Sequence, residues 1–420
     1  MNNKITTRAP GSGPSLCIVA RKLGRTSEVW LWRQIAALDR VRPSVLTWEW
    51  LNREEFALPG VVVKDLAGKP WPEKNNIKKR WAARLERTWM RNYYAAAGSE
   101  KAHLHAAIAE LRPDLLLCHT GPVALQMLPV AKALAIPIFA HFHGRDLSAA
   151  LNEVWYRYSL RRCASEFSGI VVVNEGQKAR LVHMGVPEER IHIIPCGAPM
   201  PDVTAASGRS KGDIIRFIGV SRLVEKKGIT YTLKAFSEVL ESVPNSELIL
   251  IGSGPQKQEL VDLARSLGIA NEVDFRGSLP NHEVQNLLSS ADIFVQHSVV
   301  AADDNDEGSP VSVAEAAAWS LPVVATSGVG GMDRLVVHEK TGFLVQQRDV
   351  KDMAEKMQCL AADPSLRNRF GRAARELLID QFELHKQVAK LERALLGDRL
   401  VSARDVRAYW AEGHRDNDVV

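Results

Sequence analysis

Short apolar runs that alternate with helical patterns constrain the fold of this chain most strongly. In the first half, these runs cover Leu16 to Ala20, Asp114 to Cys118, Ile136 to Ala140 and Ile170 to Val173. In the second half, they cover Ile214 to Val220, Glu247 to Ile251, Val273 to Phe275, Asp292 to Val295, Pro322 to Ala325 and Gly342 to Val345. Continuous apolar strands are typical of parallel sheets with helices on both faces. The pattern predicts an α/β fold of doubly wound parallel sheets.

A polar segment without strand character, between Met200 and Asp213, divides the chain. The 420 residues suffice for two or three domains. We therefore predict two Rossmann-like domains, residues 1–200 and 213–385, and a C-terminal part, residues 386–420. In that part, a helix near Leu384 to Leu396 is expected to cross back onto the first domain, followed by a mobile tail after Leu400.

Composition and charge exclude several classes of protein. The chain is 46% apolar and 25% charged, an ordinary globular balance. No apolar run approaches the roughly 18 residues that span a bilayer, and the polar N-terminus, Met1 to Pro14, does not resemble a signal peptide. We therefore expect a cytoplasmic protein. A net charge of +5 is too small to imply binding of nucleic acid.

The five cysteines are dispersed along the chain, which argues against a disulfide framework and against a zinc site. We interpret them as small buried hydrophobic residues. They are Cys17, Cys118, Cys163, Cys196 and Cys359.

Basic residues are concentrated between Lys74 and Arg91, where seven Lys or Arg accompany one acid, Glu86. Apolar side chains recur there every four residues, which places them on one helix face: Ile77, Trp81, Leu85, Trp89 and Tyr93. Such a helix suits the anionic inner surface of a cell membrane. Packing of the stripe against its own domain is the alternative, and the sequence leaves both open.

Two glutamates, Glu307 and Glu315, bracket the start of a helix predicted over Val311 to Trp319. The residues between the first glutamate and the helix are Gly308, Ser309 and Pro310, and proline is favoured in a first helical turn. A helix N-terminus offers free N–H groups, and carboxylates accept hydrogen bonds from hydroxyls. The segment therefore predicts a site for a phosphorylated sugar, with Gly308 to Val311 contacting the donor.

Two cations, Arg222 and Lys227, follow the first strand of the second domain together. Ligands bind at the carboxyl edge of doubly wound sheets, and an Arg and a Lys at that edge suit a diphosphate. A solvated basic loop is the alternative.

Glycines follow the next strand, in Ile251-Gly252-Ser253-Gly254-Pro255. Because Lys257 occupies the position of a third glycine, the nicotinamide fingerprint is incomplete. We interpret Gly252 and Gly254 as a turn that lets backbone approach a nucleotide. The loop that contains Leu279 is predicted to flank the base.

Three residues of the first domain are also candidates. Gly24 lies in a strand-to-helix turn that suits a phosphate, although a plain tight turn explains it equally well. His143 follows a predicted strand and precedes a glycine, and Asp146 comes three residues later. A histidine in this place can bond a sugar hydroxyl or act as a base.

The acidic run from Asp303 to Glu307 offers oxygen atoms that could bind Mg²⁺ or Mn²⁺. We favour a solvated loop instead, because no strand–Asp-x-Asp–strand context surrounds it. No metal ligand is therefore predicted.

Together these motifs resemble glycosyltransferase family 4, the retaining enzymes of GT-B fold, in which two Rossmann-like domains face each other across a cleft. The resemblance is carried by Ser221 to Gly228, the glycine turn, the pair Glu307 and Glu315, and Thr341 to Val345. Ser27 to Trp30 and Phe142 to Ser148 resemble the exopolysaccharide branch, which includes colanic-acid-type enzymes. One departure stands out, since Arg334 occupies a position where the family often has Glu, and Asp333 is the nearest acid.

The resemblance implies a role for each candidate residue. Arg222 and Lys227 would hold the diphosphate of a nucleotide-diphosphate sugar, Glu315 the ribose, and Glu307 the hydroxyls of the sugar. His143 would lie at the reacting centre, and the acceptor, near Asp146, would lie in the first domain.

The implied reaction is retaining transfer of a hexosyl-type group to a glycan or lipid-linked acceptor in surface polysaccharide biosynthesis, with no required cofactor. Arg222 and Lys227 would stabilise the leaving diphosphate. Two alternatives stay open: a sugar-nucleotide epimerase of similar build, and a non-catalytic sugar-nucleotide-binding partner in a polysaccharide-assembly complex.

Overall fold

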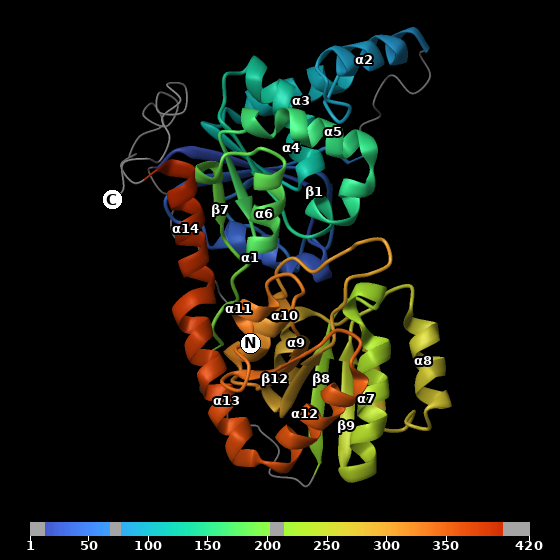
Figure 1. The fold of residues 1–420 in the computed structure, drawn as a ribbon. Helices are drawn as coiled ribbons and strands as arrows, with labels where there is room; N and C mark the ends of the chain where they lie inside the picture. Colours follow the sequence, from blue (N-terminus) through green and yellow to red (C-terminus); the bar gives the residue numbers. More distant parts are fainter. Residues whose placement is uncertain (1–12, 68–76, 202–213, 398–420) are drawn as a thin grey trace. The chain divides into compact units, whose positions relative to one another are not determined.

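The computed structural model describes residues 13–67, 77–201 and 214–397, which divide into two compact units (Figure 1). The N-terminal unit contains residues 13–195 and 388–397, and the C-terminal unit contains residues 196–387. Most of the predicted linker, the predicted mobile tail and Lys74 lie outside the described residues.

The sheet of the N-terminal unit has seven parallel strands in the order β3-β2-β1-β4-β5-β6-β7. The strands are β1 (Ser15–Leu23), β2 (Arg42–Trp50), β3 (Val62–Asp65), β4 (Leu115–His119), β5 (Ile138–His141), β6 (Gly169–Val172) and β7 (Ile191–Ile193). The helices are α1 (Val29–Ala36), α2 (Ile77–Trp89), α3 (Gly98–Leu111), α4 (Gly121–Ala133), α5 (Val154–Cys163), α6 (Glu175–His183) and the later part of α14 (Leu384–Leu396).

Side chains on both faces of this sheet are buried. Along β1, Cys17 and Val19 pack into one core with α3, α4 and α5. Leu16 and Ile18 pack on the opposite face with α1 and with Leu391 of α14. Burial on both faces explains why these strands are continuous apolar runs in the sequence.

The sheet of the C-terminal unit has six parallel strands in the order β10-β9-β8-β11-β12-β13. The strands are β8 (Ile215–Val220), β9 (Ser246–Ile251), β10 (Val273–Gly277), β11 (Ile293–Gln296), β12 (Val323–Thr326) and β13 (Gly342–Val345). The helices are α7 (Ile229–Ser242), α8 (Lys257–Ser266), α9 (Asn281–Ser290), α10 (Val311–Ala318), α11 (Met332–Leu335), α12 (Val350–Ala362), α13 (Pro364–Leu377) and the beginning of α14.

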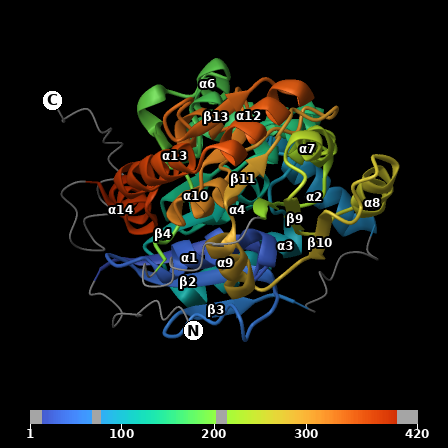
Figure 2. The same cartoon turned by 90° about the horizontal axis from the view of Figure 1, so that it is seen from below.

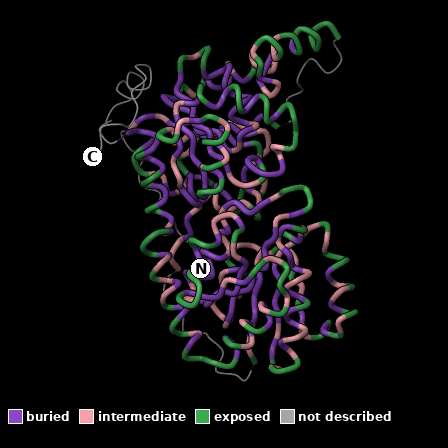
Figure 3. Tube along the Cα trace, viewed as in Figure 1, coloured by how far each residue is buried: buried purple, intermediate pink, exposed green. Residues whose placement is uncertain are grey.

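Helices also cover both faces of the second sheet (Figure 2). Along β11, Ile293 and Val295 face a core that includes α7, α8 and α12, whereas Phe294 faces a core that includes α9, α10 and α11. Figure 3 shows the resulting pattern, with buried residues inside each unit and exposed residues mainly at its outside. The predicted class, an α/β fold of doubly wound parallel sheets, is confirmed.

Three strands of the first sheet were not predicted. β3 and β7 are its edge strands, and each has only three or four residues. β2 is longer but ends in Trp48, Glu49 and Trp50, which are only half-buried. A mixed, half-exposed strand lacks the continuous apolar run that identified the others.

The last helix, α14, has the predicted bounds, Leu384–Leu396. Besides the packing of Leu391, Oε1 of Glu392 accepts hydrogen bonds from the backbone N–H groups of Asp39 and Arg40 at 2.9 and 2.6 Å. These bonds fasten α14 to the segment between α1 and β2.

The cysteines correct one expectation. All five are free, and Cys17, Cys118 and Cys163 are buried as predicted, but Cys196 is only partly buried and Cys359 is exposed. Cys359 lies on the outer face of α12, so its neighbours Met357 and Leu360, rather than the cysteine, fill the core. Across the described residues, no helix has both the length and the apolar character needed to cross a membrane.

Candidate active site

Two loops of the C-terminal unit leave the sheet where its strand order reverses. β8 is followed in sequence by its neighbour on one side, β9, whereas β11 is followed by its neighbour on the other side, β12. Loops that diverge in this way leave a crevice at the carboxyl edge, the usual ligand site of doubly wound folds. The loop after β8 carries Arg222 and Lys227, and the loop after β11 carries Glu307.

A glycine allows these two loops to touch. Gly228 has φ +55°, and a Cβ there would lie 1.8 Å from the carbonyl oxygen of His297, so a larger residue does not fit. Next to it, the N–H of Val299 donates to the carbonyl oxygen of Lys226 at 2.9 Å. The loop after β8, residues 221–228, is called the basic loop, and the loop after β11, residues 297–310, is called the acidic loop. Backbone contacts therefore hold the basic loop against the acidic loop.

Glu307 lies among cations. Its Oε2 is 2.5 Å from Nζ of Lys227, and its Oε1 is 3.8 Å from Nζ of Lys226. Lys226 also donates to the carbonyl oxygen of Asp306 at 2.7 Å, and both Lys226 and Glu307 are buried. Burial alone would raise the pKa of Glu307, but Lys227 and Lys226 outweigh it and lower the pKa to about 2. The carboxylate is therefore charged throughout the neutral range.

Arg222 completes the cluster electrostatically. Its side chain is exposed, and its charge contributes both to the lowered pKa of Glu307 and to the lowered pKa of Lys226, for which burial is the larger cause. The structure thus brings Arg222, Lys227 and Glu307 together at one edge of the sheet. Three cations, Arg222, Lys226 and Lys227, act on Glu307, and the acid Asp306 acts on Lys226, so the balance is positive and favours an anionic ligand.

The glycine turn after β9 lies against the same basic loop. A Cβ at Gly252, which has φ +133°, would lie 1.8 Å from the carbonyl oxygen of Ser221, and one at Gly254 would lie 2.2 Å from that of Leu223. The close approach that these glycines permit is thus to the chain's own backbone. The hydroxyl of Ser253 is 2.7 Å from that of Ser278, next to Leu279, so the loop after β10 joins this edge.

The start of α10 is where the sequence placed it. Pro310 caps the helix, Val311 is its first residue, and the hydroxyl of Ser309 accepts a hydrogen bond from the N–H of Cys196 at 3.2 Å. Gly308 precedes them and is buried. Glu315 is buried on α10, and its Oε1 accepts a hydrogen bond from Nε2 of Gln285 on α9 at 3.1 Å.

Gly24 of the N-terminal unit has a local structural explanation. It has φ +80°, and a Cβ there would lie 2.0 Å from the carbonyl oxygen of Leu51. Its own carbonyl oxygen accepts from the side-chain amide of Asn52 at 2.9 Å. The turn after β1 is therefore packed against the residues that follow β2.

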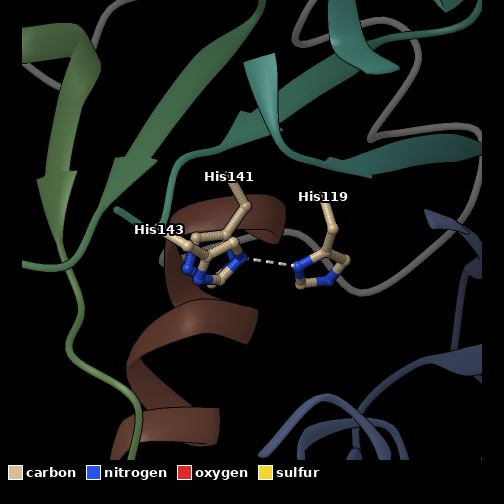
Figure 4. Close-up of side chains that lie close together, drawn as sticks. All are labelled: His119, His141 and His143. Atoms are coloured by element: carbon tan, nitrogen blue, oxygen red, sulfur yellow. Dashed lines mark hydrogen bonds between the residues drawn. The ribbon is translucent and has the colours of Figure 1, made fainter. Parts of the chain in front are cut away.

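His143 belongs to a group of three histidines at the carboxyl edge of the first sheet (Figure 4). His119 ends β4 and His141 ends β5. Nδ1 of His119 is 2.9 Å from Nε2 of His143, and the ring of Trp30 lies 4.1 Å from that of His143. Burial is the main cause that lowers the pKa of all three, in the case of His119 to about 3. The three rings are therefore uncharged at neutral pH.

Asp146 fixes the backbone beside this group. Its Oδ1 accepts from the N–H groups of His143 and Gly144 at 3.0 and 3.1 Å, and its Oδ2 accepts from the N–H of Gly121 at 3.1 Å. Burial raises the pKa of Asp146, and these bonds oppose the rise. The carboxylate thus holds the loop after β5 against the start of α4.

Three residues of these sites were missed from the sequence. From the sequence, a role was assigned to Lys227 and none to Lys226, but the structure buries Lys226 beside Glu307. His119 was missed because it ends a different strand from the one that precedes His143, and His141 was given no role although it lies two residues before His143. The contact follows from the pairing of β4 with β5, in which Cα register pairs His119 with His141 directly.

The acidic run shows no such gathering. Among the described residues, the three histidines are the group whose atoms lie close enough together to hold a metal ion, and the carboxylates from Asp303 to Glu307 do not form one. Arg334 occupies a position where the family often has Glu, and its guanidinium lies over the ring of Phe382. The neighbouring Asp333 accepts a hydrogen bond from the N–H of Gly328 at 2.9 Å.

Helix α2 has an exposed apolar stripe. Trp81 is 57% exposed and Trp89 is 86% exposed, and Ile77 and Leu85 are exposed as well. The opposite side of the helix faces α3, where Arg87 pairs with Glu100 at 2.9 Å. Four members of the stripe are therefore exposed, whereas the fifth, Tyr93, packs against Trp155 of α5 with ring centroids 4.4 Å apart.

Solved structures identify the fold, and family models identify the family. HepE of Anabaena, solved in complex with UDP and glucose, aligns over 91% of this chain and 100% of its own length with a TM-score of 0.73 at 17% identity. The fold is that of the GT-B glycosyltransferases. The models described as "Glycosyl transferases group 1" and "Glycosyltransferase Family 4" match residues 204–377 and 41–200. The chain belongs to glycosyltransferase family 4 and is a glycosyltransferase.

Curated relatives are distant. A protein named for colanic acid biosynthesis, the glycosyltransferase WcaL of Escherichia coli, is 29% identical over 59% of this chain and 61% of its own length. The matched region thus spans less than two thirds of that relative. The GDP-mannose-dependent alpha-(1-6)-phosphatidylinositol monomannoside mannosyltransferase of Mycolicibacterium smegmatis is 29% identical over 66% of this chain and 75% of its own length. Membership of the family favours the predicted transferase over the epimerase and over the non-catalytic partner.

Proposed function

We propose that this enzyme transfers a hexosyl-type sugar, with retention, from a nucleotide-diphosphate sugar to a glycan or lipid-linked acceptor in surface polysaccharide biosynthesis. The observation that carries the proposal is the cluster of Arg222, Lys226, Lys227 and Glu307 at the point of strand-order reversal. Names of relatives support the choice of substrates, since one concerns colanic acid and another a GDP-mannose-dependent transfer.

The cluster suits the charge changes of the reaction. When the bond to the sugar breaks, negative charge develops on the leaving diphosphate, and preorganised cations stabilise it. Arg222 is exposed and can fork around a phosphate, while Lys227 supplies a compact charge beside it. Buried Lys226 touches the backbone of the acidic loop and so positions Glu307.

The carboxylate of Glu307 is proposed to accept hydrogen bonds from the hydroxyls of the donor sugar. Because the pKa of Glu307 lies near 2, its oxygens are unprotonated and accept hydrogen bonds without proton transfer. We assign Glu315, one turn into α10, to the ribose, with the start of α10 and the loops of Gly252, Gly254 and Leu279 around the nucleotide. We favour front-face attack, in which the leaving phosphate takes the proton of the acceptor hydroxyl.

In the N-terminal unit, His143 is the candidate for a contact to the reacting sugar, and Asp146 positions its backbone. The acceptor is assigned to this unit. Helix α2 is proposed to bind an anionic membrane surface, where lipid-linked acceptors are found. Its exposed tryptophans suit the interface, and each basic residue near an anionic surface contributes about 1 kcal/mol.

The proposal is tested by transfer assays with UDP and GDP sugars and a panel of glycan and lipid-linked acceptors. Arg222→Ala and Lys227→Ala are each expected to lower the rate roughly 100-fold, or by about 3 kcal/mol. Lys234→Ala, which removes an exposed cation of α7, is the matched control and should retain wild-type turnover. Near-normal turnover in both site variants would contradict the assignment.

A further inference from the structure

The three histidines of the N-terminal unit are brought together by strand pairing. β4 and β5 are parallel neighbours, and His119 and His141 are Cα partners in their register. Partners in adjacent strands point to the same side of a sheet, about 5 Å apart. His143 follows two residues later, and its ring lies 4.3 Å from that of His141 and 5.2 Å from that of His119. The sheet itself therefore gathers the imidazoles (Figure 4).

Two of the rings are buried with unused nitrogen atoms. His141 is fully buried and His119 is 3% exposed. Within the described part of the chain, neither ring nitrogen of His141 has a hydrogen-bond partner, and neither does Nε2 of His119. A buried polar atom without a partner costs about 1–3 kcal/mol and is rare in folded proteins. The unpartnered nitrogens of His141, on a ring beside the facing nitrogens of His119 and His143, indicate a place for a ligand.

We propose that His119, His141 and His143 bind one divalent transition-metal ion, with Zn²⁺ as the best match. One nitrogen from each ring can be chosen so that all three lie within 4.8 Å of one another. Three imidazoles that leave a fourth position open are an established ligand set for zinc. Imidazole nitrogens are among the commonest metal ligands in proteins.

The geometry needs only a small adjustment. At Zn–N distances of about 2.0–2.1 Å, two ligands of a tetrahedral ion lie about 3.4 Å apart. Nδ1 of His119 and Nε2 of His143 are already 2.9 Å apart. The three chosen nitrogens lie within 4.8 Å of one another, so ring movements on the order of 1 Å would reach this spacing.

Surrounding contacts hold the third ligand in place. Nε2 of Gln177 donates to the carbonyl oxygen of His143 at 2.7 Å, and Asp146 accepts from its N–H. The ring of Trp30 packs against the ring of His143. Such outer contacts orient ligands and strengthen metal binding. The all-nitrogen set also predicts selectivity, because Mg²⁺ and Ca²⁺ require oxygen ligands.

The test is calorimetric titration of the chelator-treated full chain, without donor or acceptor. We expect one Zn²⁺ per chain, no binding of Mg²⁺, and a Co²⁺ form with the visible absorption of a four-coordinate site. His119→Gln, His141→Gln and His143→Gln should each weaken Zn²⁺ binding at least about 10-fold, because even outer contacts contribute about 10–100-fold. His183→Gln, on the surface of α6 in the same unit, is the control and should bind like wild type.

Two results would overturn the proposal: a wild-type chain that binds no Zn²⁺, or binding that survives in all three ligand variants. Since the wild-type titration decides the first, a variant that fails to fold does not weaken the test. The result is also separable from the proposed function. Metal binding is measured without turnover, and donor binding is measured with chelator present.

Discussion

The proposed donor site depends on Glu307, a buried carboxylate. Two lysines, and not solvent, stabilise its negative charge. Glu307 and Lys226 are both buried, and Lys227 pairs with Glu307 at 2.5 Å. Removing one partner of a buried ion pair leaves the other charge uncompensated and typically costs 3–5 kcal/mol. A neutral replacement at this position therefore affects folding as well as catalysis.

We predict that Glu307→Gln lowers the free energy of unfolding by about 3 kcal/mol at pH 7 and abolishes measurable transfer. Chemical denaturation and the transfer assay measure the two effects. Glu259→Gln, which changes an exposed carboxylate of α8, is the matched control and should leave both unchanged. Wild-type stability in Glu307→Gln would show that the ion pair contributes nothing.

The same residue predicts a pH dependence. The folded pKa of Glu307, about 2, lies below its usual value of 4.5. Stability from this carboxylate is therefore fully present above about pH 4.5 and is lost as the pH falls toward 2. The stability difference between wild type and Glu307→Gln should shrink between pH 5 and pH 3. A difference independent of pH over this range would be inconsistent with the lowered pKa.

Sequence patterns identified part of each site. Arg222, Lys227 and Glu307 follow predicted strands, so their place at one sheet edge could be inferred. The adjacent pair Lys226 and Lys227 gave no indication of which lysine is buried. The contact between His119 and His143 depends on the pairing of two strands, and strand order cannot be read from a single sequence.

At the scale of elements, the turn after β9 supports the basic loop. Gly252 is both in a left-handed region and crowded, with the carbonyl oxygen of Ser221 1.8 Å from an added Cβ. Gly268, at the end of α8, has φ +73° but nothing within 4 Å of an added Cβ. Substitution of Gly268 therefore tests backbone strain alone, whereas substitution of Gly252 tests strain together with steric contact with the basic loop.

We predict that Gly268→Ala costs about 1 kcal/mol, the usual cost of a left-handed alanine, and leaves nucleotide binding intact. Gly252→Ala should cost more and should weaken nucleotide binding at least about 10-fold, because the Ser221 backbone must move. Thermal unfolding and nucleotide titration check both variants. Equal effects of the two substitutions would show that the crowding is unimportant.

Helix α2 is expected to bind anionic membranes through its basic side chains. Vesicles with anionic lipids should bind the wild type, and vesicles of zwitterionic lipid should bind it weakly. Reversing Lys78, Arg80 and Arg84 to Glu should abolish binding to anionic vesicles, because the attraction becomes repulsion. Reversing Lys234, Lys351 and Arg372, exposed cations elsewhere, is the control with the same charge change. Unchanged binding after reversal in α2 would remove the membrane proposal.

At the scale of the whole molecule, both sheets could be predicted because their central strands are buried on two faces and read as apolar runs. The exposed edge strand β3 has no such signal, since Val62 is 62% exposed and Lys64 and Asp65 follow it. Helix α14 was placed correctly because Leu391 and Leu395 repeat at helical spacing on its buried side. A strand of these sheets is therefore predictable from the sequence when its side chains are buried on both faces of the sheet.

The most direct test of the donor site is an experimental structure of the enzyme with UDP or GDP bound. We predict a phosphate oxygen within about 3 Å of Nζ of Lys227 or of the Arg222 guanidinium, at the crevice between the loops after β8 and β11. Density for the diphosphate at another part of the molecule, with Lys227 still paired to Glu307 alone, would contradict it.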